Sequence, residues 1–492
     1  MGPARRDREQ PWLNQPSAAE QLWYRGFIAR AFFAEQDQAP QEFIFIPEDL
    51  QARLPVSEVA AHQPESQPPL DLGAPLGMLV CEPAPSAGAS PDDITTVLAY
   101  LQIASVELTG AAILPRHRET LSRFLRLPEA LDLYLHLILR LGLAEGTPLK
   151  PEPTRARPFL ESPRAAQGMV LASAWRDSKE WNDLLHVPGL VFEGAAWHND
   201  PHTARLAILN LLREAAPGQW WPAAALVQAV KARLPDFQRP SGDYDSWYIR
   251  EAATKASLRG FAHWDQVDGM LVHWLLEKPL FWLGVVELGT ANVPAPTSTP
   301  GDSAAPDAMA AKVFRITSLG ARFLAATTEG ERREEPDPPA PSIVVEPDAT
   351  LRVPMTVSRY DRFQIARVCN WLPLEPEAYA YRLSPASLAR AARQSIKVNH
   401  ILAFLQKSLG EQALPPHLAG ALQRWERAGP EAAVKEMVTL KLKSPEMLEN
   451  LLRMPGVRRY LGEKLSPTLV EVHPAEVARL RKVLAELGIL AD

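Results

Sequence analysis

The stretch "YRLSPASLARAARQS", residues 381–395, changes from a strand pattern to a helix pattern within a few residues. Ser384 followed by Pro385 is typical of a helix N-cap and first helical position. The serine oxygen can accept a backbone N–H there, and proline lacks only a donor that the first turn leaves unused. The stretch therefore predicts a strand that leads directly into a helix.

One side of this predicted helix is basic. Because a helix turns by about 100° per residue, positions three and four apart share a face. Leu388 and Ala392 then face away from the charges. The basic side carries Arg390, Arg393 and Lys397.

The neighbouring segments predict the rest of a small α/β unit. Residues 343–354, "IVVEPDATLRVP", indicate a hairpin in which Asp348 turns the chain by bonding backbone N–H groups two residues on. Asp348 has no second acid or histidine at a fixed spacing, so we favour a turn over catalysis. Helices are predicted from Ser358 to Trp371 and over 398–409. The inward positions of the last helix are Ile401, Leu402, Leu405 and Leu409.

The segment from Arg352 to Ser408 is strongly basic. It carries nine Lys or Arg against three Asp or Glu, a net charge of +6, in a chain of 492 residues with a formal charge of −6. A patch of this size could contact several phosphates. A solvated helix face is the alternative, and we leave both open. The residues predicted to bind DNA are Arg359, Arg362, Arg367, Arg382, Arg390, Arg393, Lys397 and Lys407.

Several short pieces carry a resemblance to a known domain. They are "VVEPDATLRVP", "YRLSPASLARA", "ILAFLQKS", "ALPPHLAGALQRW" and the tail "LSPTLVEVHPAEVARLRKVLAELGI". Their order and spacing over 343–492 resemble the helicase-associated domain found near the N-terminus of XPB-type DNA-repair helicases and in stand-alone bacterial proteins. One departure is Gln394-Ser395, where a glycine between two helices is expected. The resemblance implies DNA contact or docking to a nucleic-acid enzyme.

The motor that follows this domain in XPB-type helicases is not visible in the sequence. No G-x-x-x-x-G-K-[ST] occurs, and no G-x-G-x-x-G follows a predicted strand. Neither G-x-S-x-G nor H-E-x-x-H is present. We therefore expect no ATP hydrolysis, no catalytic residues, no cofactor and no enzyme activity.

The middle of the chain, residues 98–327, predicts winged-helix-like modules. Helix, strand, loop, strand and helix follow one another over 131–160 and again over 266–325. Two modules, 98–165 and 200–327, are the natural division. The N-terminal piece could be a third, poorer copy. The predicted fold class is thus α+β and mainly helical, with winged-helix-like modules before a small α/β helicase-associated domain.

Two features of this middle region argue against DNA contact there. The helix predicted near 265–277 carries acids but no Lys or Arg, whereas a recognition helix needs cations or amides toward the groove. Nine of the thirteen tryptophans lie between Trp175 and Trp282. They could stack single-stranded bases, but few basic residues accompany them, so we favour a core role. The main basic cluster is Arg250, Lys255 and Arg259.

Proline-rich segments separate these parts. The chain has 47 prolines, about twice the usual share of ~5%. They predict linkers at 56–97 and 328–342, because such stretches cannot bury enough apolar surface to order themselves. The remaining divisions are a helix and strand piece at 1–55, the middle region at 98–327, and the helicase-associated-like domain at 343–492.

Metal, disulfide and membrane roles have little support. Two cysteines rule out a disulfide framework, and no apolar run is long enough for a membrane span. His198 and His202 flank Asp200 at a spacing that could bind zinc, but Asp200-Pro201 is also a good helix start. A second group without a recognised ligand spacing is His263, Asp265, Asp268 and His273. We expect no metal and a cytoplasmic location.

The sequence thus favours a non-catalytic protein that binds DNA or assists a helicase. Its partners would be DNA and a separate helicase or nuclease, without a membrane. A protein-interaction scaffold that docks such an enzyme without touching DNA is the alternative. A nuclease would need clustered carboxylates that the sequence does not display.

Overall fold

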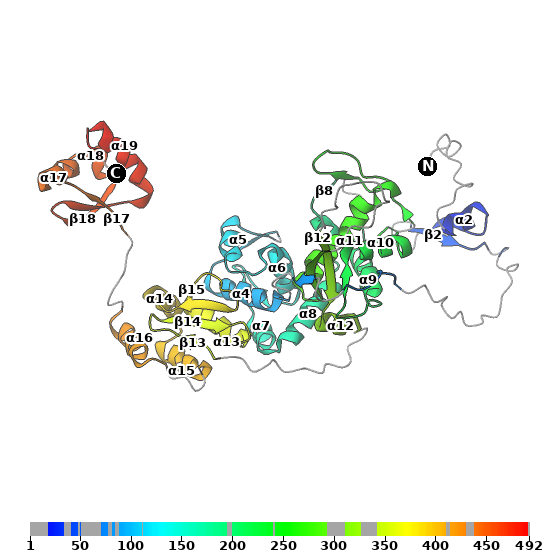
Figure 1. The fold of residues 1–492 in the computed structure, drawn as a ribbon, viewed down its shortest axis with the longest axis horizontal. Helices are drawn as coiled ribbons and strands as arrows, with labels where there is room; N and C mark the ends of the chain where they lie inside the picture. Colours follow the sequence, from blue (N-terminus) through cyan, green and yellow to red (C-terminus); the bar gives the residue numbers. More distant parts are fainter. Residues whose placement is uncertain are drawn as a thin grey trace. The chain divides into compact units, whose positions relative to one another are not determined.

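The chain divides into two compact units, residues 1–419 (unit 1) and 420–492 (unit 2), which we describe separately (Figure 1). The fold is α+β and mainly helical, as predicted, with small antiparallel sheets. Within the part of the chain described, no helix is long and apolar enough to cross a membrane. The computed structural model describes residues 18–33, 41–47, 50, 70–76, 81–83, 88–110, 112–193, 199–239, 242–292, 310–325, 342–409, 414–429 and 437–490.

The N-terminal piece contains one helix and one hairpin. Helix α2 (Ala18–Tyr24) precedes strands β1 (Ala29–Phe33) and β2 (Gln41–Phe45). The two strands pair antiparallel, with Ala29 opposite Phe45. These elements lie within the predicted N-terminal piece 1–55, of which residues 1–17, 34–40, 48–49 and 51–55 lie outside the described residues.

Residues 90–161 build a first helical module. Its last two strands follow helix α6 (Leu131–Arg140), and Gly142, two residues beyond that helix, has a φ of +62°. This left-handed conformation suits glycine and lets the Leu143 N–H donate to Ile138 O at 2.9 Å before the strand begins. The helices are α4 (Ser90–Ile103), α5 (Pro115–Ser122), α6 (Leu131–Arg140) and α7 (Pro153–Glu161), with the turn η2 (Pro128–Ala130). The strand pairs are β4 (Leu108–Thr109) with β5 (Ala112–Ile113), and β6 (Ala144–Glu145) with β7 (Lys150–Pro151).

Residues 201–325 build a second module, in which the long helix is also followed by a glycine with a positive φ. Gly284 has a φ of +75°, and the Val285 N–H donates to Leu280 O at 2.9 Å. The helices are α9 (Pro201–Leu212), α10 (Ala223–Arg233), the joined η6 (Asp265–Gly269), α11 (Met270–Leu275) and η7 (Leu276–Leu280), and α12 (Ser318–Ala325). The sheet has the order β3 (Cys81–Pro83), β11 (Val286–Asn292), β12 (Ala310–Ile316), β9 (Trp220–Pro222).

Further elements lie between and within the modules. They are α8 (Arg164–Arg176), η3 (Asp183–His186), η5 (Phe261–His263), and the pair β8 (Leu190–Phe192) and β10 (Ile249–Glu251). In both modules a helix, two paired strands and a second helix follow one another in the predicted order. The second wing would occupy residues 293–309, which are outside the described residues, so the winged-helix interpretation stays a prediction.

Residues 342–429 add a four-stranded sheet and four helices. The predicted helix 358–371 ends three residues early, because residues 370–371 pair as a strand with residues 381–382. The sheet has the order β13 (Val344–Val345), β14 (Thr350–Pro354), β16 (Ala378–Arg382), β15 (Asn370–Trp371). The helices are α13 (Arg359–Val368), α14 (Pro385–Arg393), α15 (Val398–Ser408) and α16 (Pro416–Ala428).

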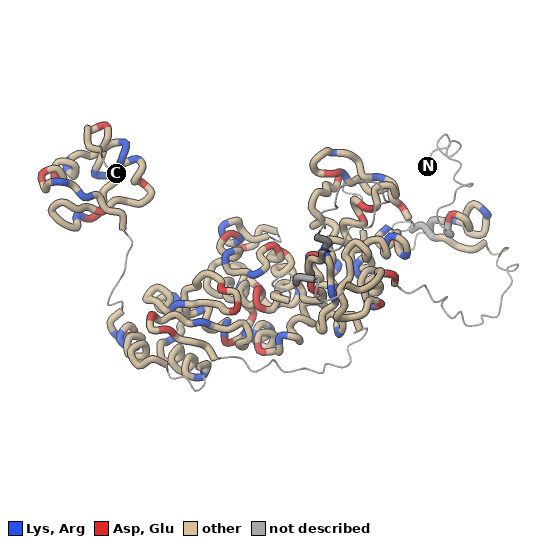
Figure 2. Tube along the Cα trace, in the orientation of Figure 1, with Lys and Arg blue, Asp and Glu red and all other residues tan. Residues whose placement is uncertain are grey.

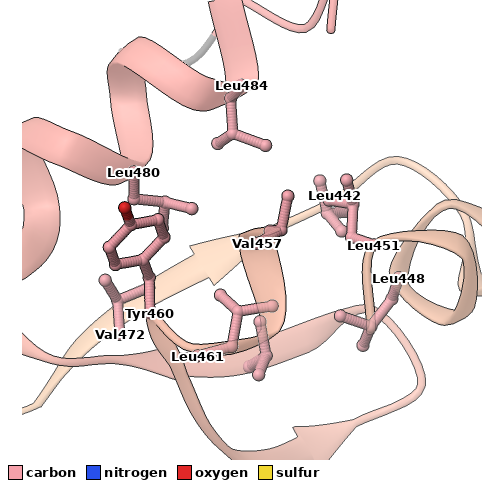
Figure 3. Close-up of a cluster of buried hydrophobic side chains, with 10 residues drawn as sticks. Leu442, Leu448, Leu451, Val457, Tyr460, Leu461, Val472, Leu480 and Leu484 are labelled. Atoms are coloured by element: carbon pink, nitrogen blue, oxygen red, sulfur yellow. The ribbon is translucent and has the colours of Figure 1, made fainter. Parts of the chain in front are cut away.

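Unit 2 has its own apolar core beneath a three-stranded sheet (Figure 3). The sheet has the order β17 (Val438–Lys441), β19 (Leu469–Val472), β18 (Leu461–Ser466). The helices are α17 (Pro445–Arg453), α18 (Pro455–Arg458), η8 (Pro474–Glu476) and α19 (Val477–Glu486). The buried side chains include Leu442, Leu448, Leu451, Val457, Tyr460, Leu461, Val470, Val472, Leu480 and Leu484.

Two predicted boundaries need correction. Helix α4 begins at Ser90, inside the predicted linker 56–97, with proline at its first turn. Its acidic first turn lacks an apolar pattern, so its burial depends on partners distant in sequence. Residues 343–419 belong to unit 1, not to a separate domain 343–492, because α13 packs against α4.

Candidate nucleic-acid interface

Asp348 makes the predicted turn. Its Oδ1 accepts a hydrogen bond from the Thr350 N–H at 3.1 Å, and its Oδ2 pairs with Arg382 Nη2 at 2.9 Å. Hydrogen bonds from the hydroxyl and the N–H of Thr350 hold the pKa of Asp348 below its ordinary value. The next residue, Ala349, has a φ of +65° and closes the hairpin. The turn role is confirmed.

The start of α14 is also as predicted. Ser384 Oγ accepts from the Ser387 N–H at 3.1 Å, and Ser387 Oγ accepts from the Ser384 N–H at 3.0 Å. Pro385 occupies the first turn. These reciprocal bonds satisfy two donors that the helix itself leaves without partners.

The end of α14 explains the departure at Gln394-Ser395. Ser395 has a φ of +61°, the left-handed conformation that usually favours glycine. Its N–H donates to Ala392 O at 2.9 Å, and the Ile396 N–H donates to Ala391 O at 3.0 Å. This is the bonding of a glycine-type helix end, made with serine at the position where the resemblance implies glycine.

Lys397 does not lie on the face of α14 that we predicted for it. The helix ends at Arg393, the chain reverses at Ser395, and Lys397 is the N-cap residue of α15. The prediction treated residues 385–397 as one continuous helix. The rotation of about 100° per residue holds only within such a helix, so it does not place Lys397 beyond the turn. Arg390 and Arg393 remain on α14, and Arg393 is close enough to Arg390 to lower the pKa of that side chain, after the larger effect of burial.

Arg362 is buried rather than exposed to a ligand. Its side chain is 2% exposed, Nη1 donates to Thr96 Oγ1 at 3.0 Å, and Nη2 donates to Asp92 O. Nη1 also lies 3.4 Å from the Tyr381 hydroxyl, and the guanidinium lies 4.0 Å from the ring centroid of Tyr379. The residue therefore joins α13 to the first turn of α4.

Arg359 behaves in the same way. It is 2% exposed, and Nη2 donates to Ser162 O at 3.2 Å. We therefore correct the prediction for Arg359 and Arg362, because a guanidinium covered by protein on all sides does not present its charge to a phosphate.

Arginines from the first module close the same contact from the other side. Arg164 pairs with Asp92 Oδ2 at 2.5 Å and donates to Met355 O at 2.9 Å. Arg126 donates to Glu375 O at 2.9 Å and to Pro376 O at 3.0 Å. We call this contact the arginine seam; it consists of Arg126, Arg164, Arg359 and Arg362.

Asp93 lies at the base of the arginine seam. Its carboxylate accepts the N–H groups of Arg126 and Leu127, each at 2.9 Å, and the Tyr134 hydroxyl at 3.3 Å. Burial raises the pKa of Asp93 to about 7, against the opposing effect of the two backbone hydrogen bonds.

Three further predicted residues are partly committed to the protein. Arg382 is exposed but pairs with Asp348. Arg390 donates to Cys369 O and to Asn370 Oδ1, the latter at 3.3 Å. Arg367 is half-buried and donates to Gln364 Oε1 at 2.9 Å. These contacts orient the side chains along the sheet and α13, so a ligand would have to compete for them.

The exposed basic trio is Arg393, Lys397 and Lys407. They lie at the end of α14, at the N-cap of α15 and in the last turn of α15. With a rise of about 1.5 Å per residue, α15 separates its two lysines by roughly 15 Å. Elsewhere in unit 1, Lys and Arg are interspersed with Asp and Glu (Figure 2).

The tryptophans are core residues, as predicted. Trp221 is half-buried, and Trp197 lies outside the described residues. The helix over 265–277 is likewise packed at Val267, Leu271 and Leu275, although Met270 is exposed. The buried tryptophans of this region are Trp175, Trp181, Trp220, Trp247, Trp264, Trp274 and Trp282.

The candidate metal ligands have other partners. Asp200 accepts from the His202 N–H at 3.0 Å as the N-cap of α9. Asp265 pairs with Lys231, and the buried Asp268 pairs with Arg239. His198 lies outside the described residues. Among the residues that are described, no three His, Cys, Asp or Glu side chains could together hold a metal ion.

Basic residues in unit 2 were not among our predicted DNA contacts. Its described residues 437–490 carry nine Lys or Arg against six Asp or Glu. Five of the nine lie in 458–459 and 479–482. A charge count over these 54 residues would have found them. No sequence signal identifies Arg126 or Arg164, because the partners that define their role lie 72 to 250 residues away in sequence.

Comparisons with known proteins connect part of this chain to helicases. No family model matches the sequence. A stretch of 157 residues is 31% identical to the DNA 3'-5' helicase XPB of Kineococcus radiotolerans. The match covers 30% of this chain and 28% of that protein, so it spans under a third of the relative's length. The chain is therefore similar to an XPB helicase over one limited stretch.

Proposed function

We propose that this protein is a non-catalytic DNA-binding or helicase-accessory protein. It would contact the phosphate backbone through the exposed basic trio, Arg393, Lys397 and Lys407. The similarity to an XPB helicase over 157 residues is the observation that carries this proposal. The chain would supply DNA contact or docking, while a separate helicase or nuclease would supply the chemistry.

The geometry of the trio supports backbone contact rather than base reading. The roughly 15 Å between the α15 lysines corresponds to about four base-pair steps along a duplex. Lysine and arginine at the ends of helices can hold phosphates without entering a groove. Binding of this kind is insensitive to sequence and strongly dependent on salt.

Fluorescence anisotropy with duplex, forked and single-stranded DNA tests the proposal. The wild-type chain should bind with an affinity that falls steeply as salt rises. Reversing Arg393, Lys397 and Lys407 together to Glu should weaken binding about tenfold or more at low salt. The variant should also reduce the slope of log K against log salt by about 2 to 3, since each lost phosphate contact removes ~0.9.

A matched variant separates local contact from bulk charge. Reversing the exposed Arg123, Lys255 and Arg322 to Glu changes the net charge equally but leaves the trio intact. It should bind nearly as well as wild type. Binding that is independent of salt, or absent at micromolar protein, would exclude DNA contact. A helicase or nuclease that co-purifies after nuclease treatment would then favour the scaffold alternative.

A further inference from the structure

Unit 2 contains an open depression of about 530 Å³. Its size falls in the range of about 300–1,000 Å³ that is typical of ligand sites. Three parts of the fold form its wall: the residues after α18, the residue after β19, and η8 with the first turn of α19. The lining residues are Arg459, Tyr460, His473, Ala475, Glu476 and Arg479.

The core holds the polar residues of this depression in place. Arg459, His473 and Arg479 each neighbour a buried residue in sequence, and these neighbours are Tyr460, Val472 and Leu480. Figure 3 shows the Tyr460 ring lying beside Val472 and Leu480. The His473 N–H also donates to Tyr460 O at 3.3 Å. The core therefore fixes the backbone positions from which two guanidinium groups and an imidazole line one open depression.

The chemistry of the lining favours an anion. Arg459 lies over the Tyr460 ring, 4.6 Å from its centroid, which orders the planar guanidinium. Arg479 pairs with Glu476 through Nη1 at 3.0 Å, and a guanidinium has five N–H donors. Glu476 is the one acid in the lining. Because one guanidinium can donate two parallel hydrogen bonds to phosphate oxygens, the two arginines of the lining suit a phosphate group.

The lining does not favour base recognition. Tyr460 is 8% exposed and lies beneath Arg459, so its ring is not available as a stacking surface. Arg481 and Lys482 are exposed on the same helix as Arg479, and Lys482 lies one turn beyond it. Figure 2 shows Lys and Arg positions along this part of unit 2. These exposed basic residues suit a nucleic-acid backbone that continues past the depression along α19.

We propose that this depression is a second DNA contact, in which Arg459, His473 and Arg479 hold a phosphate of the nucleic-acid backbone. The site rests on the proposed function, and it extends DNA contact from unit 1 to unit 2. Two separate phosphate contacts on one chain would raise affinity more than either alone.

The test uses the full chain carrying Arg459→Glu and Arg479→Glu. Duplex DNA binding measured by anisotropy should weaken about five- to tenfold near 0.1 M salt, and the salt slope should fall by about 2. The control is Arg453→Glu with Lys464→Glu, which makes the same charge change in unit 2 outside the depression. The control should change the affinity less than twofold.

Arginine modification gives an independent readout. Phenylglyoxal labelling followed by peptide mass spectrometry should show that duplex DNA protects Arg459 and Arg479 but not Arg453. Equal losses of affinity in both double variants, or no protection of Arg459 and Arg479, would overturn the site. If the wild-type chain binds DNA and the Arg459→Glu, Arg479→Glu variant binds it with the same affinity, only the proposed site in unit 2 is refuted. A wild-type chain that binds no DNA refutes the proposed function itself.

Discussion

Replacing Arg362 by methionine tests whether this residue belongs to the core or to a DNA-binding surface. Methionine keeps an apolar stem of similar length but removes the guanidinium. The loss affects the bonds to Thr96 Oγ1 and Asp92 O and the contact with the Tyr379 ring. It also leaves the buried carboxylate of Asp92 without one of the positive charges near it.

The magnitude follows from burial. Hydrogen bonds to charged groups contribute about 1.5–3 kcal/mol each, and removing one partner of a buried charged contact costs about 3–5 kcal/mol. We expect Arg362→Met to lower the free energy of unfolding of unit 1 by about 3–5 kcal/mol. Arg362→Lys should lie between wild type and Met, because lysine keeps the charge but loses the planar fork.

Guanidinium chloride unfolding followed by tryptophan fluorescence measures the effect, because the reporting tryptophans are buried in unit 1. The midpoint should fall without a change in m-value. Arg393→Met is the control: this exposed residue should change stability by less than about 0.5 kcal/mol. If Arg362→Met unfolds like wild type but binds DNA more weakly, Arg362 acts at the surface and the core assignment is wrong.

Three further substitutions test single features of the fold. Ser395→Gly should raise the free energy of unfolding by about 0.5–1 kcal/mol, because serine at this position has a left-handed backbone conformation that glycine adopts without strain. Ala392→Gly, within α14, is the control and should lower the free energy of unfolding by a similar amount. Equal effects of the two substitutions in denaturant melts would contradict this reasoning. Ala349→Gly should likewise stabilise the hairpin by about 0.5 kcal/mol, and a lower unfolding midpoint would count against the turn geometry. Because burial raises the pKa of Asp93 from 3.8 to about 7, the folded protein keeps a proton that the unfolded chain releases, so stability should fall as pH rises from about 4 to about 7. Unfolding of Asp93→Asn across this range should lack that decline; an unchanged pH profile would show that Asp93 titrates normally.

Short-range sequence patterns were enough to predict much of the local structure. The Ser384 cap, the Asp348 turn and the Asp200 cap depend on bonds that span two or three residues. Such short-range bonds form wherever the residue pattern occurs, so they could be predicted without the fold. The spacing of apolar residues over 398–409 likewise predicted which face of that helix is buried, and Ile401, Leu402, Leu405 and Leu409 are buried. The tryptophan core followed from the lack of accompanying basic residues.

The availability of each basic residue to a ligand could not be predicted, because it depends on the packing of distant segments. In the sequence, Arg362 and Arg393 have the same charge and comparable neighbours. Arg362 is buried because Asp92 and Thr96, roughly 270 residues earlier, lie against it, while Arg393 ends a helix in solvent. The depression in unit 2 depends in the same way on three segments that meet across its core. Burial is a property of packing between distant segments, and a local pattern of charge does not contain it.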